Sequence, residues 1–291
     1  MLFDDRFPLT EVDTGTVRLN LRRGGEGPPL LLLHGFPQTH AMWHLVAPAL
    51  ARHFHLVMPD LRGYGDSGRP PSTADHLPYS KRAMAGDMAA LMSALGHERF
   101  AVAGHDRGAR VTHRLALDFA PRVTRACVMD IVPTRHLFTH TDQVFATAYY
   151  HWFFLIQPDG LPERMIGADP GWYLRECIRR WAAPGANFDP AALAEYERCF
   201  RRPDNVHAAC EDYRAGSSID LEHDAASSAQ RIECPLLVLW GGRGFVHRHY
   251  AVLDVWRQYA TDVRGRALDC GHFLPEERPD DVVAEMLAFF A

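Results

Sequence analysis

Short apolar runs alternate with longer helix-like segments along most of the chain, and this alternation constrains the fold more than any other feature. Runs this short, apolar on both faces, are typical of buried parallel strands. The spacing of apolar residues predicts helices over residues 80–95 and 109–119. Strand and helix in alternation predict an α/β fold, a mostly parallel sheet flanked by helices. The predicted strands are residues 30–33, 55–58, 100–103, 126–129, 236–240 and a shorter run at 266–268.

The alternation stops after Pro133 and resumes at Pro235. The segment 133–228 shows no strand pattern, is rich in aromatic residues, and has helical pieces separated by prolines. This pattern predicts a helical cap domain at 133–228, inserted into a core domain made of 1–132 and 229–291. A core with a smaller inserted domain also suits a length of 291 residues.

Composition excludes several classes of protein. Hydrophobic residues make up 47% and charged residues 23%, which is ordinary for a globular chain. The formal net charge of -5 argues against nucleic-acid binding through bulk positive charge. No apolar run approaches the roughly 18–20 residues that span a bilayer, and the first residues lack a signal-peptide pattern. We therefore expect a cytoplasmic protein that binds neither nucleic acid nor membrane.

Cysteine and histidine spacing gives no metal signature. The six cysteines are scattered singly without a C-x-x-C pair, so we expect inert thiols. His136 and His140 are four residues apart but lack the glutamate of an H-E-x-x-H motif. We expect no metal site.

The strongest chemical signal is Gly104-His105-Asp106-Arg107-Gly108, directly after a predicted strand and before a predicted helix. It has the form of the nucleophile elbow G-x-S-x-G with Asp in place of Ser. A carboxylate that attacks a saturated carbon forms an ester, which water can hydrolyse, whereas a serine would form a stable ether. Asp106 therefore points to displacement at an alkyl halide or an epoxide. The alternative is that Asp106 has no chemical role and that its side chain only caps the helix.

Hydrolysis of such an ester needs a base and an acid that orients it. His272, after the last predicted strand, is the candidate base. The loop after strand 236–240 carries no carboxylate, and Gly244 stands where an aspartate is expected in many such hydrolases. Asp130, at the end of the preceding strand, is the candidate for the orienting acid.

At this point the sequence resembles the α/β-hydrolase family over nearly its whole length, and within it the fluoroacetate dehalogenases. The resemblance implies the same assignment of Asp106, His272 and Asp130, no cofactor, and a homodimer. The motifs that carry it are the elbow, His34–Pro37, Asp60–Ser67, Asp130–Thr134, His151–Phe154, Glu211–Arg214 and Gly271–Phe273.

Arg107 and Arg110 lie three residues apart on the first turn of the helix after the nucleophile and share a face. Arginines on a helix often only solvate it. Beside a nucleophilic carboxylate, two guanidinium groups would grip a substrate carboxylate, the role that the resemblance implies. The substrate is then a small 2-halo acid. The backbone N–H groups of Phe36 and Arg107 are the expected oxyanion donors.

A departing halide needs hydrogen-bond donors, and the predicted cap offers His151, Trp152 and Tyr213. The resemblance supports this role over plain core packing. Tyr150 and Trp181 are expected to line the pocket.

These residues predict a haloacetate dehalogenase that converts fluoroacetate to glycolate and fluoride. The first alternative is an epoxide hydrolase, in which Tyr213 with Tyr149 or Tyr150 protonates the epoxide oxygen. Against it, Arg107 and Arg110 would place two cations beside a neutral substrate. The second alternative is a non-catalytic ligand-binding protein of the same fold, since a fold does not dictate function.

Overall fold

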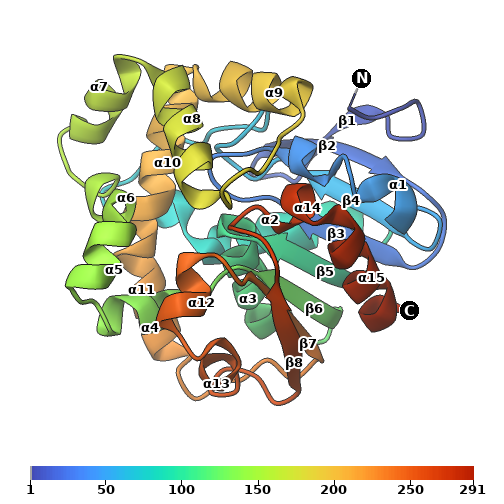
Figure 1. Ribbon diagram of the computed structural model, residues 1–291. Helices are drawn as coiled ribbons and strands as arrows, with labels where there is room; N and C mark the ends of the chain where they lie inside the picture. Colours follow the sequence, from blue (N-terminus) through green and yellow to red (C-terminus); the bar gives the residue numbers. More distant parts are fainter. Residues whose placement is uncertain (1) are drawn as a thin grey trace.

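The computed structural model describes residues 2–291, which contain one eight-stranded sheet in the order β1-β2-β4-β3-β5-β6-β7-β8 (Figure 1). Strand β2 runs antiparallel to its neighbours β1 and β4, and all other adjacent strands are parallel. The predicted α/β fold is confirmed. The strands are β1 Leu9–Asp13, β2 Arg18–Gly24, β3 Pro29–Leu33, β4 His55–Pro59, β5 Phe100–His105, β6 Val123–Met129, β7 Leu236–Gly241 and β8 Val263–Leu268.

All six predicted strands occur, as β3 to β8, and the antiparallel pair β1 and β2 was not predicted. Its signal is present as the period-2 pattern of Leu19 and Leu21, buried, beside the exposed Arg18. Many polar residues hide this pattern, because β1 is an edge strand and its outer positions face solvent.

Helices of the core follow the strands in a doubly wound order. Because crossovers between parallel strands are right-handed, α1 lies on one face of the sheet and α2 and α3 on the other. Contacts agree, since α1 packs with α15 and α2 packs with α3. The helices of the core are η1 His40–Trp43, α1 Ala47–Leu50, η2 Leu77–Tyr79, α2 Lys81–Ala94, α3 Arg107–Asp118, α12 Phe245–His249, α13 Val252–Trp256, α14 Leu274–Glu277 and α15 Pro279–Phe290.

Helices α4 to α11 occupy the stretch between β6 and β7, and residues 134–226 contain no strand. They gather on the left and at the top of the view in Figure 1, beside the sheet. All eight helices fall inside the predicted cap segment, 133–228, whose boundaries stay a prediction. They are α4 Thr134–Thr139, α5 Gln143–Ala148, α6 Tyr150–Phe154, α7 Leu161–Gly167, α8 Pro170–Trp181, α9 Pro190–Phe200, α10 Pro203–Gly216 and α11 Ile219–Ala226.

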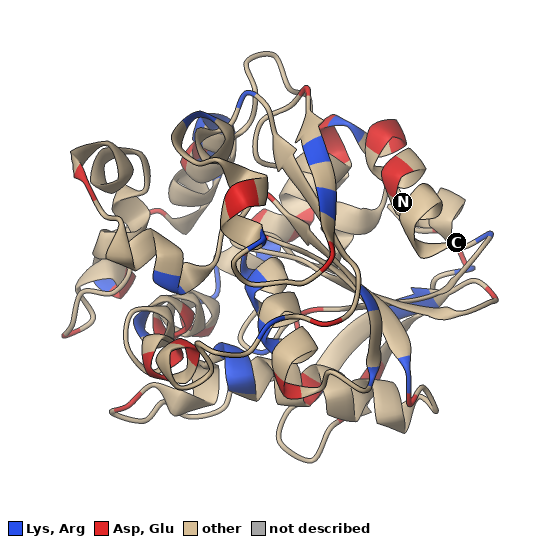
Figure 2. Cartoon of the chain, turned by 90° about the horizontal axis from the view of Figure 1, so that it is seen from below, with Lys and Arg blue, Asp and Glu red and all other residues tan. Residues whose placement is uncertain are grey.

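The central strands are buried on both faces, as a parallel sheet covered by helices requires. Every residue of Leu30–Leu33 is fully buried, and so are most residues of β6 and β7. Charged residues of both signs occur together on the surrounding helices (Figure 2). Within residues 2–291, no helix is both long and apolar enough to cross a membrane.

The chain order of the sheet reverses at β3, because β4 lies on one side of it and β5 on the other. Ligands of open α/β sheets bind beyond the carboxyl ends of the strands at such a reversal. The loops after β3 and β5 carry Phe36 and Asp106, so the fold brings the predicted nucleophile and one predicted oxyanion donor to this point.

The turn from β5 into α3 depends on two glycines that let backbones approach. A Cβ on Gly108 would overlap the carbonyl oxygens of Leu33 and His34, at the end of β3. A Cβ on Gly104 would overlap the Gly108 carbonyl and lie 2.5 Å from the Thr112 hydroxyl. Glycine at these positions lets α3 start close against β3.

We predict that Gly108→Ala lowers the free energy of unfolding by about 1–3 kcal/mol or more, because the added methyl group meets rigid backbone. Gly86→Ala is the matched control, since Gly86 lies inside α2 with open space around its Cβ position. That control should gain about 1 kcal/mol through helix propensity. Urea unfolding of both variants measures the difference, and equal stability of the two would contradict the close approach.

Candidate active site

Asp106 lies at the tight turn between β5 and α3, with φ 47° and ψ -115°. Positive φ is uncommon for a residue other than glycine and occurs where the surrounding structure imposes it. Asp106 occupies the N-cap position of α3, yet its side chain makes no capping hydrogen bond. Its Oδ1 instead accepts a hydrogen bond of 2.9 Å from the Phe36 backbone N–H. The alternative of a simple helix cap is therefore wrong.

His272 lies between two carboxylates. Its Nδ1 is 2.6 Å from Asp130 Oδ2 and therefore donates to it, and its Nε2 is 4.0 Å from Asp106 Oδ2. Asp130 Oδ1 accepts from the Gly241 backbone N–H at 2.9 Å, which holds this carboxylate in place. All three candidate residues are at least nine-tenths buried. The fold thus aligns Asp106, His272 and Asp130 in one chain of contacts.

The backbone around His272 is also held. Its N–H donates to the Trp181 carbonyl at 2.9 Å, and its own carbonyl accepts from His105 Nε2 at 2.7 Å. Burial lowers the pKa of His105 to about 3, so this neighbouring ring stays neutral. A neutral His105 that donates at Nε2 adds no positive charge beside the base.

The position of Asp130 explains why Gly244 can replace the acid that is often found after β7. A Cβ on Gly244 would lie 3.8 Å from both carboxylate oxygens of Asp130. The loops after β6 and β7 therefore reach the same place, and a carboxylate from either one can meet the histidine.

Neighbouring charges shift the pKa values of both Asp106 and His272. Burial alone would raise the pKa of Asp106, but His272 and the nearby arginines hold it below its usual range. Burial alone would lower the pKa of His272, but the hydrogen bond and charge of Asp130, with Asp106, raise it above its usual value. Asp106 is therefore ionised at neutral pH, as a nucleophile must be.

The two predicted oxyanion donors lie at this carboxylate. The Phe36 N–H already binds Asp106 Oδ1. The Arg107 N–H is the first of α3, where backbone donors have no partner within the helix. Gly35 leaves room for the approach, since a Cβ there would lie 2.5 Å from the Cβ of Asp106.

Arg107 and Arg110 do not solvate the helix, because only 1% and 4% of their surface is exposed. The guanidinium group of Arg107 already forms an ion pair with Asp212. Its Nε and Nη2 each bind an oxygen of the Asp212 carboxylate at 2.8 Å, and Nη2 also reaches the Asp212 carbonyl. Arg107 is therefore paired with Asp212 of α10, and its binding of a substrate carboxylate stays a prediction.

Arg110 is different, because Nη1 donates only to the Val132 carbonyl and the Thr134 hydroxyl. Within residues 2–291 no carboxylate lies in ion-pair distance of it, and its buried Nε has no hydrogen-bond partner. Burial, followed by the charge of Arg107, lowers its pKa to about 10. Arg110 is a buried cation without a counter-ion.

Two of the predicted halide donors are also unpartnered. His151 Nδ1 and the Tyr213 hydroxyl are buried, and neither has a hydrogen-bond partner among the described residues. Burial lowers the pKa of His151 to about 3 and raises the pKa of Tyr213, so both are neutral. The Trp152 ring lies 6.1 Å from that of Tyr213 and 4.6 Å from the Arg110 guanidinium carbon. Buried polar groups without partners are rare and require an explanation.

A cavity of about 330 Å³ opens onto Asp106, Asp130 and His272. Tyr150 and Trp181 line it as expected, and so does His151. Arg107, Arg110, Trp152 and Tyr213 are not part of its wall. Sequence reasoning missed several wall residues, namely Thr147, Ala148, Tyr149, Arg180, Ala182, Arg243, Phe245 and Arg248.

Asp212 is the most important residue that sequence reasoning left without a role. Its signal was the neighbouring Tyr213, within the motif Glu211–Arg214. Nothing local shows that its partner is Arg107, which lies 105 residues earlier in the chain.

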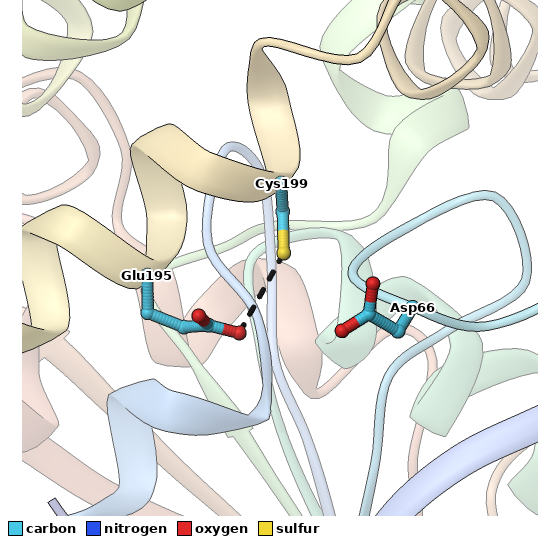
Figure 3. A group of neighbouring side chains, drawn as sticks. All are labelled: Asp66, Glu195 and Cys199. Carbon is cyan, nitrogen blue, oxygen red and sulfur yellow. Dashed lines mark hydrogen bonds between the residues drawn. The ribbon is translucent and has the colours of Figure 1, made fainter. Parts of the chain in front are cut away.

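Among the described residues, one group of potential metal ligands, Asp66, Glu195 and Cys199, lies outside the wall of this cavity (Figure 3). Its carboxylates already have cations, since Arg198 binds both Asp66 and Glu195, and Arg202 binds Asp66. Burial raises the pKa of the Cys199 thiol, whose sulfur lies 3.6 Å from Glu195. The cluster is a set of ion pairs between α9 and the loop after β4.

Comparison with known proteins agrees with this geometry, since residues 28–279 match the family described as alpha/beta hydrolase fold. The chain belongs to this family. It is 45% identical to a fluoroacetate dehalogenase from Burkholderia sp., over 96% of this chain and 92% of the relative. It is 34% identical to a soluble epoxide hydrolase from Corynebacterium sp., over 94% of each chain.

Among solved structures, one of a Nostoc sp. protein assigned to the alpha/beta hydrolases has a TM-score of 0.98 and 56% identity, covering 100% of this chain and 99% of that one. The family, the fold and the likeness to a fluoroacetate dehalogenase therefore agree with the resemblance seen in the sequence.

We predict that Asp130→Asn lowers the pKa of His272 to its ordinary value or below, because burial then acts without the opposing charge of Asp130. NMR titration of the His272 ring signal, assigned with His272→Gln, measures it. Asp142→Asn is the control, since Asp142 lies 3.7 Å from the surface residue His249 instead. An unchanged pKa of His272 in Asp130→Asn contradicts the pairing.

Proposed function

We propose that the protein hydrolyses the carbon–halogen bond of small 2-halo acids, fluoroacetate among them, through an ester of Asp106. The observation that carries this proposal is the surroundings of Asp106. A buried, ionised carboxylate lies beside unpartnered donors of His151 and Tyr213 and near Arg110, a cation without a counter-ion. A halide and a substrate carboxylate would supply the two missing partners.

In the first step, Asp106 Oδ2 attacks the carbon that bears the halogen. A C–O bond forms, the carbon–halogen bond breaks, and the halide leaves with its electron pair towards His151, Trp152 and Tyr213. Fluoride is small and hard, so several short hydrogen bonds are needed to stabilise it. Each is worth roughly 1.5–3 kcal/mol when one partner is charged.

In the second step, water hydrolyses the ester. His272 takes a proton from water, and the oxygen attacks the ester carbonyl of Asp106. The backbone N–H groups of Phe36 and Arg107 stabilise the oxyanion, and losing one such donor typically costs about 2.7–4 kcal/mol of barrier. The tetrahedral intermediate expels glycolate, whose departing oxygen takes the proton back from His272, and the Asp106 carboxylate is restored. No resident cofactor takes part in this scheme.

The substrate carboxylate is assigned mainly to Arg110, with Arg107 as a second donor. Arg107 keeps Nη1 after Asp212 has taken Nε and Nη2. Arg110 has no carboxylate partner, so a bound carboxylate removes the cost of an unpaired buried charge. This arrangement favours an anionic substrate over a neutral one.

We predict that the protein releases fluoride from fluoroacetate, and that Asp106→Asn abolishes the release. In His272→Asn the second step fails, so the carboxymethyl ester of Asp106 accumulates and the turnover rate falls by about 10²–10⁴-fold. A fluoride electrode and intact-protein mass spectrometry follow the two steps. A single turnover in heavy-oxygen water should place the oxygen label on the Asp106 carboxylate. An unlabelled Asp106 would contradict the mechanism.

The runner-up is an epoxide hydrolase, which the similarity to the Corynebacterium enzyme supports. Tyr149 lies in the cavity wall and Tyr213 is unpartnered, so two phenols are near Asp106. Incubation with styrene oxide separates the two functions, because a diol without fluoride release favours the runner-up. If Asp106→Asn and the parent are equally inert towards haloacids, the result favours a non-catalytic ligand-binding protein.

We also propose a homodimer in which the cap helices meet. Helices α6, α7 and α8 expose apolar side chains around a groove, with Met165 59% and Trp172 56% exposed. Tyr150 also lines this groove, and Leu161, at the start of α7, is exposed as well. Large exposed apolar patches mark interaction sites in soluble proteins.

We predict that Trp172→Asp converts the dimer to a monomer in light scattering. Leu45→Asp is the control, because Leu45 is 45% exposed but lies in the core domain. A monomeric parent, or a dimer that survives Trp172→Asp, rejects this interface.

A cytoplasmic location is part of the proposal. Cys127, Cys177, Cys199, Cys210 and Cys270 are buried free thiols, and Cys234 is partly exposed. Unpaired thiols suit a reducing compartment.

A further inference from the structure

Lys81 is the only lysine in a chain that has 31 lysines and arginines together. It begins α2, does not line the cavity, and has only 4% of its surface exposed. Lysines are almost never fully buried unless they are paired. Because Lys81 is buried, it does not serve as a solvated surface charge, and its ammonium group needs partners inside the protein.

Lys81 belongs to a buried ion cluster that reaches Arg107. Its Nζ binds Asp212 Oδ1, the same oxygen that accepts from Arg107 Nη2. The other oxygen of Asp212 accepts from Arg107 Nε and from the Tyr64 hydroxyl at 2.6 Å. Because four donor atoms crowd one carboxylate, a compact ammonium fits where a second planar guanidinium would not.

Asp220 is the second acid of this cluster. Its Oδ1 accepts from the Lys81 backbone N–H at 2.8 Å, whereas its Oδ2 is buried without a partner, 3.8 Å from Lys81 Nζ. Burial raises the pKa of Asp220 to about 6, and Arg107 and Lys81 hold the pKa of Asp212 below its usual range. Both acids are therefore ionised at pH 7.5.

Apart from the paired Asp130 and His272, the charges of the cluster and the site then balance. Lys81, Arg107 and Arg110 are three cations, and Asp106, Asp212 and Asp220 are three carboxylates. Without Lys81 the region would carry a net negative charge before an anionic substrate arrived. In the interior such a charge is poorly screened and acts over several ångströms.

We propose that Lys81, which does not line the cavity, sets the affinity of the site for a carboxylate substrate by offsetting Asp212 and so leaving the charge of Arg107 available. Lys81 is thus a specificity-determining residue that acts through Arg107. This inference rests on the proposed function for the identity of the substrate. The carboxylate binding it concerns can be measured without turnover.

The test is calorimetric binding of glycolate, the proposed product, at pH 7.5. Lys81→Met should weaken binding on the order of tenfold, and Asp220→Asn should strengthen it by a similar factor, because each changes the buried charge by one unit. The double variant Lys81→Met/Asp220→Asn restores the balance and should bind within about twofold of the parent. These differences should persist in 0.5 M salt, since buried charges are screened little.

Arg82→Met is the matched control. Arg82 is the next residue of α2 and loses the same charge, but it forms a surface ion pair with Asp118. Its glycolate affinity should stay within about twofold of the parent. A packing role for Lys81 predicts instead that the double variant binds as weakly as Lys81→Met. That result, or an equal loss in Arg82→Met, overturns the inference.

Activity provides a separate readout. In Lys81→Met the KM for fluoroacetate should rise with the glycolate dissociation constant, while kcat changes by less than about threefold.

If circular dichroism shows that Lys81→Met does not fold, Asp220→Asn alone decides the test, and unchanged or weaker glycolate binding by Asp220→Asn overturns the inference. A parent that binds no glycolate also overturns it. A parent that binds glycolate in this charge-dependent way but releases no fluoride refutes only the proposed function.

Discussion

The close approach of α3 to β3 is the constraint on which the site depends. Gly108 lies against the carbonyls of Leu33 and His34, and this contact fixes the start of the helix at the switch point of the sheet. Asp106 is thereby held at positive φ, with its carboxylate turned from the helix towards the Phe36 N–H. A wider turn would move Asp106 out of reach of both the Phe36 N–H and His272.

Electrostatics then separates the roles of similar groups. Asp106 and Asp130 are both buried at strand ends. Asp130 is held by Gly241 and His272, while one oxygen of Asp106 accepts no hydrogen bond from residues 2–291. Arg107 and Arg110 differ in the same way, because Asp212 pairs with Arg107 whereas Arg110 has no carboxylate within ion-pair distance among residues 2–291. Partners, and not residue types, therefore decide which groups are available to a substrate.

The ion pair of Arg107 with Asp212 also joins the core to the cap. Arg107 belongs to α3, beside the nucleophile, and Asp212 to α10, so the charge near the substrate is set jointly by both parts of the chain. The proposed halide donors His151, Trp152 and Tyr213 come from α6 and α10 as well. In the proposed mechanism, the core supplies the covalent chemistry, and the cap supplies much of what distinguishes an anionic substrate and its leaving group.

The sequence by itself determined that strands β3 to β8 form and that a tight turn carrying Asp106 joins β5 to α3, because periodicity and turn chemistry are local properties. It also placed Asp130 correctly beside His272, since Gly244 lacks a side chain. Only the tertiary structure decided that Arg107 is held by Asp212 and that the lone lysine joins them. These partners lie 105 and 131 residues apart. Such pairs form because a buried charge is stable only beside a counter-ion. The spacing of residues along the chain does not show which counter-ion lies beside it in the folded protein.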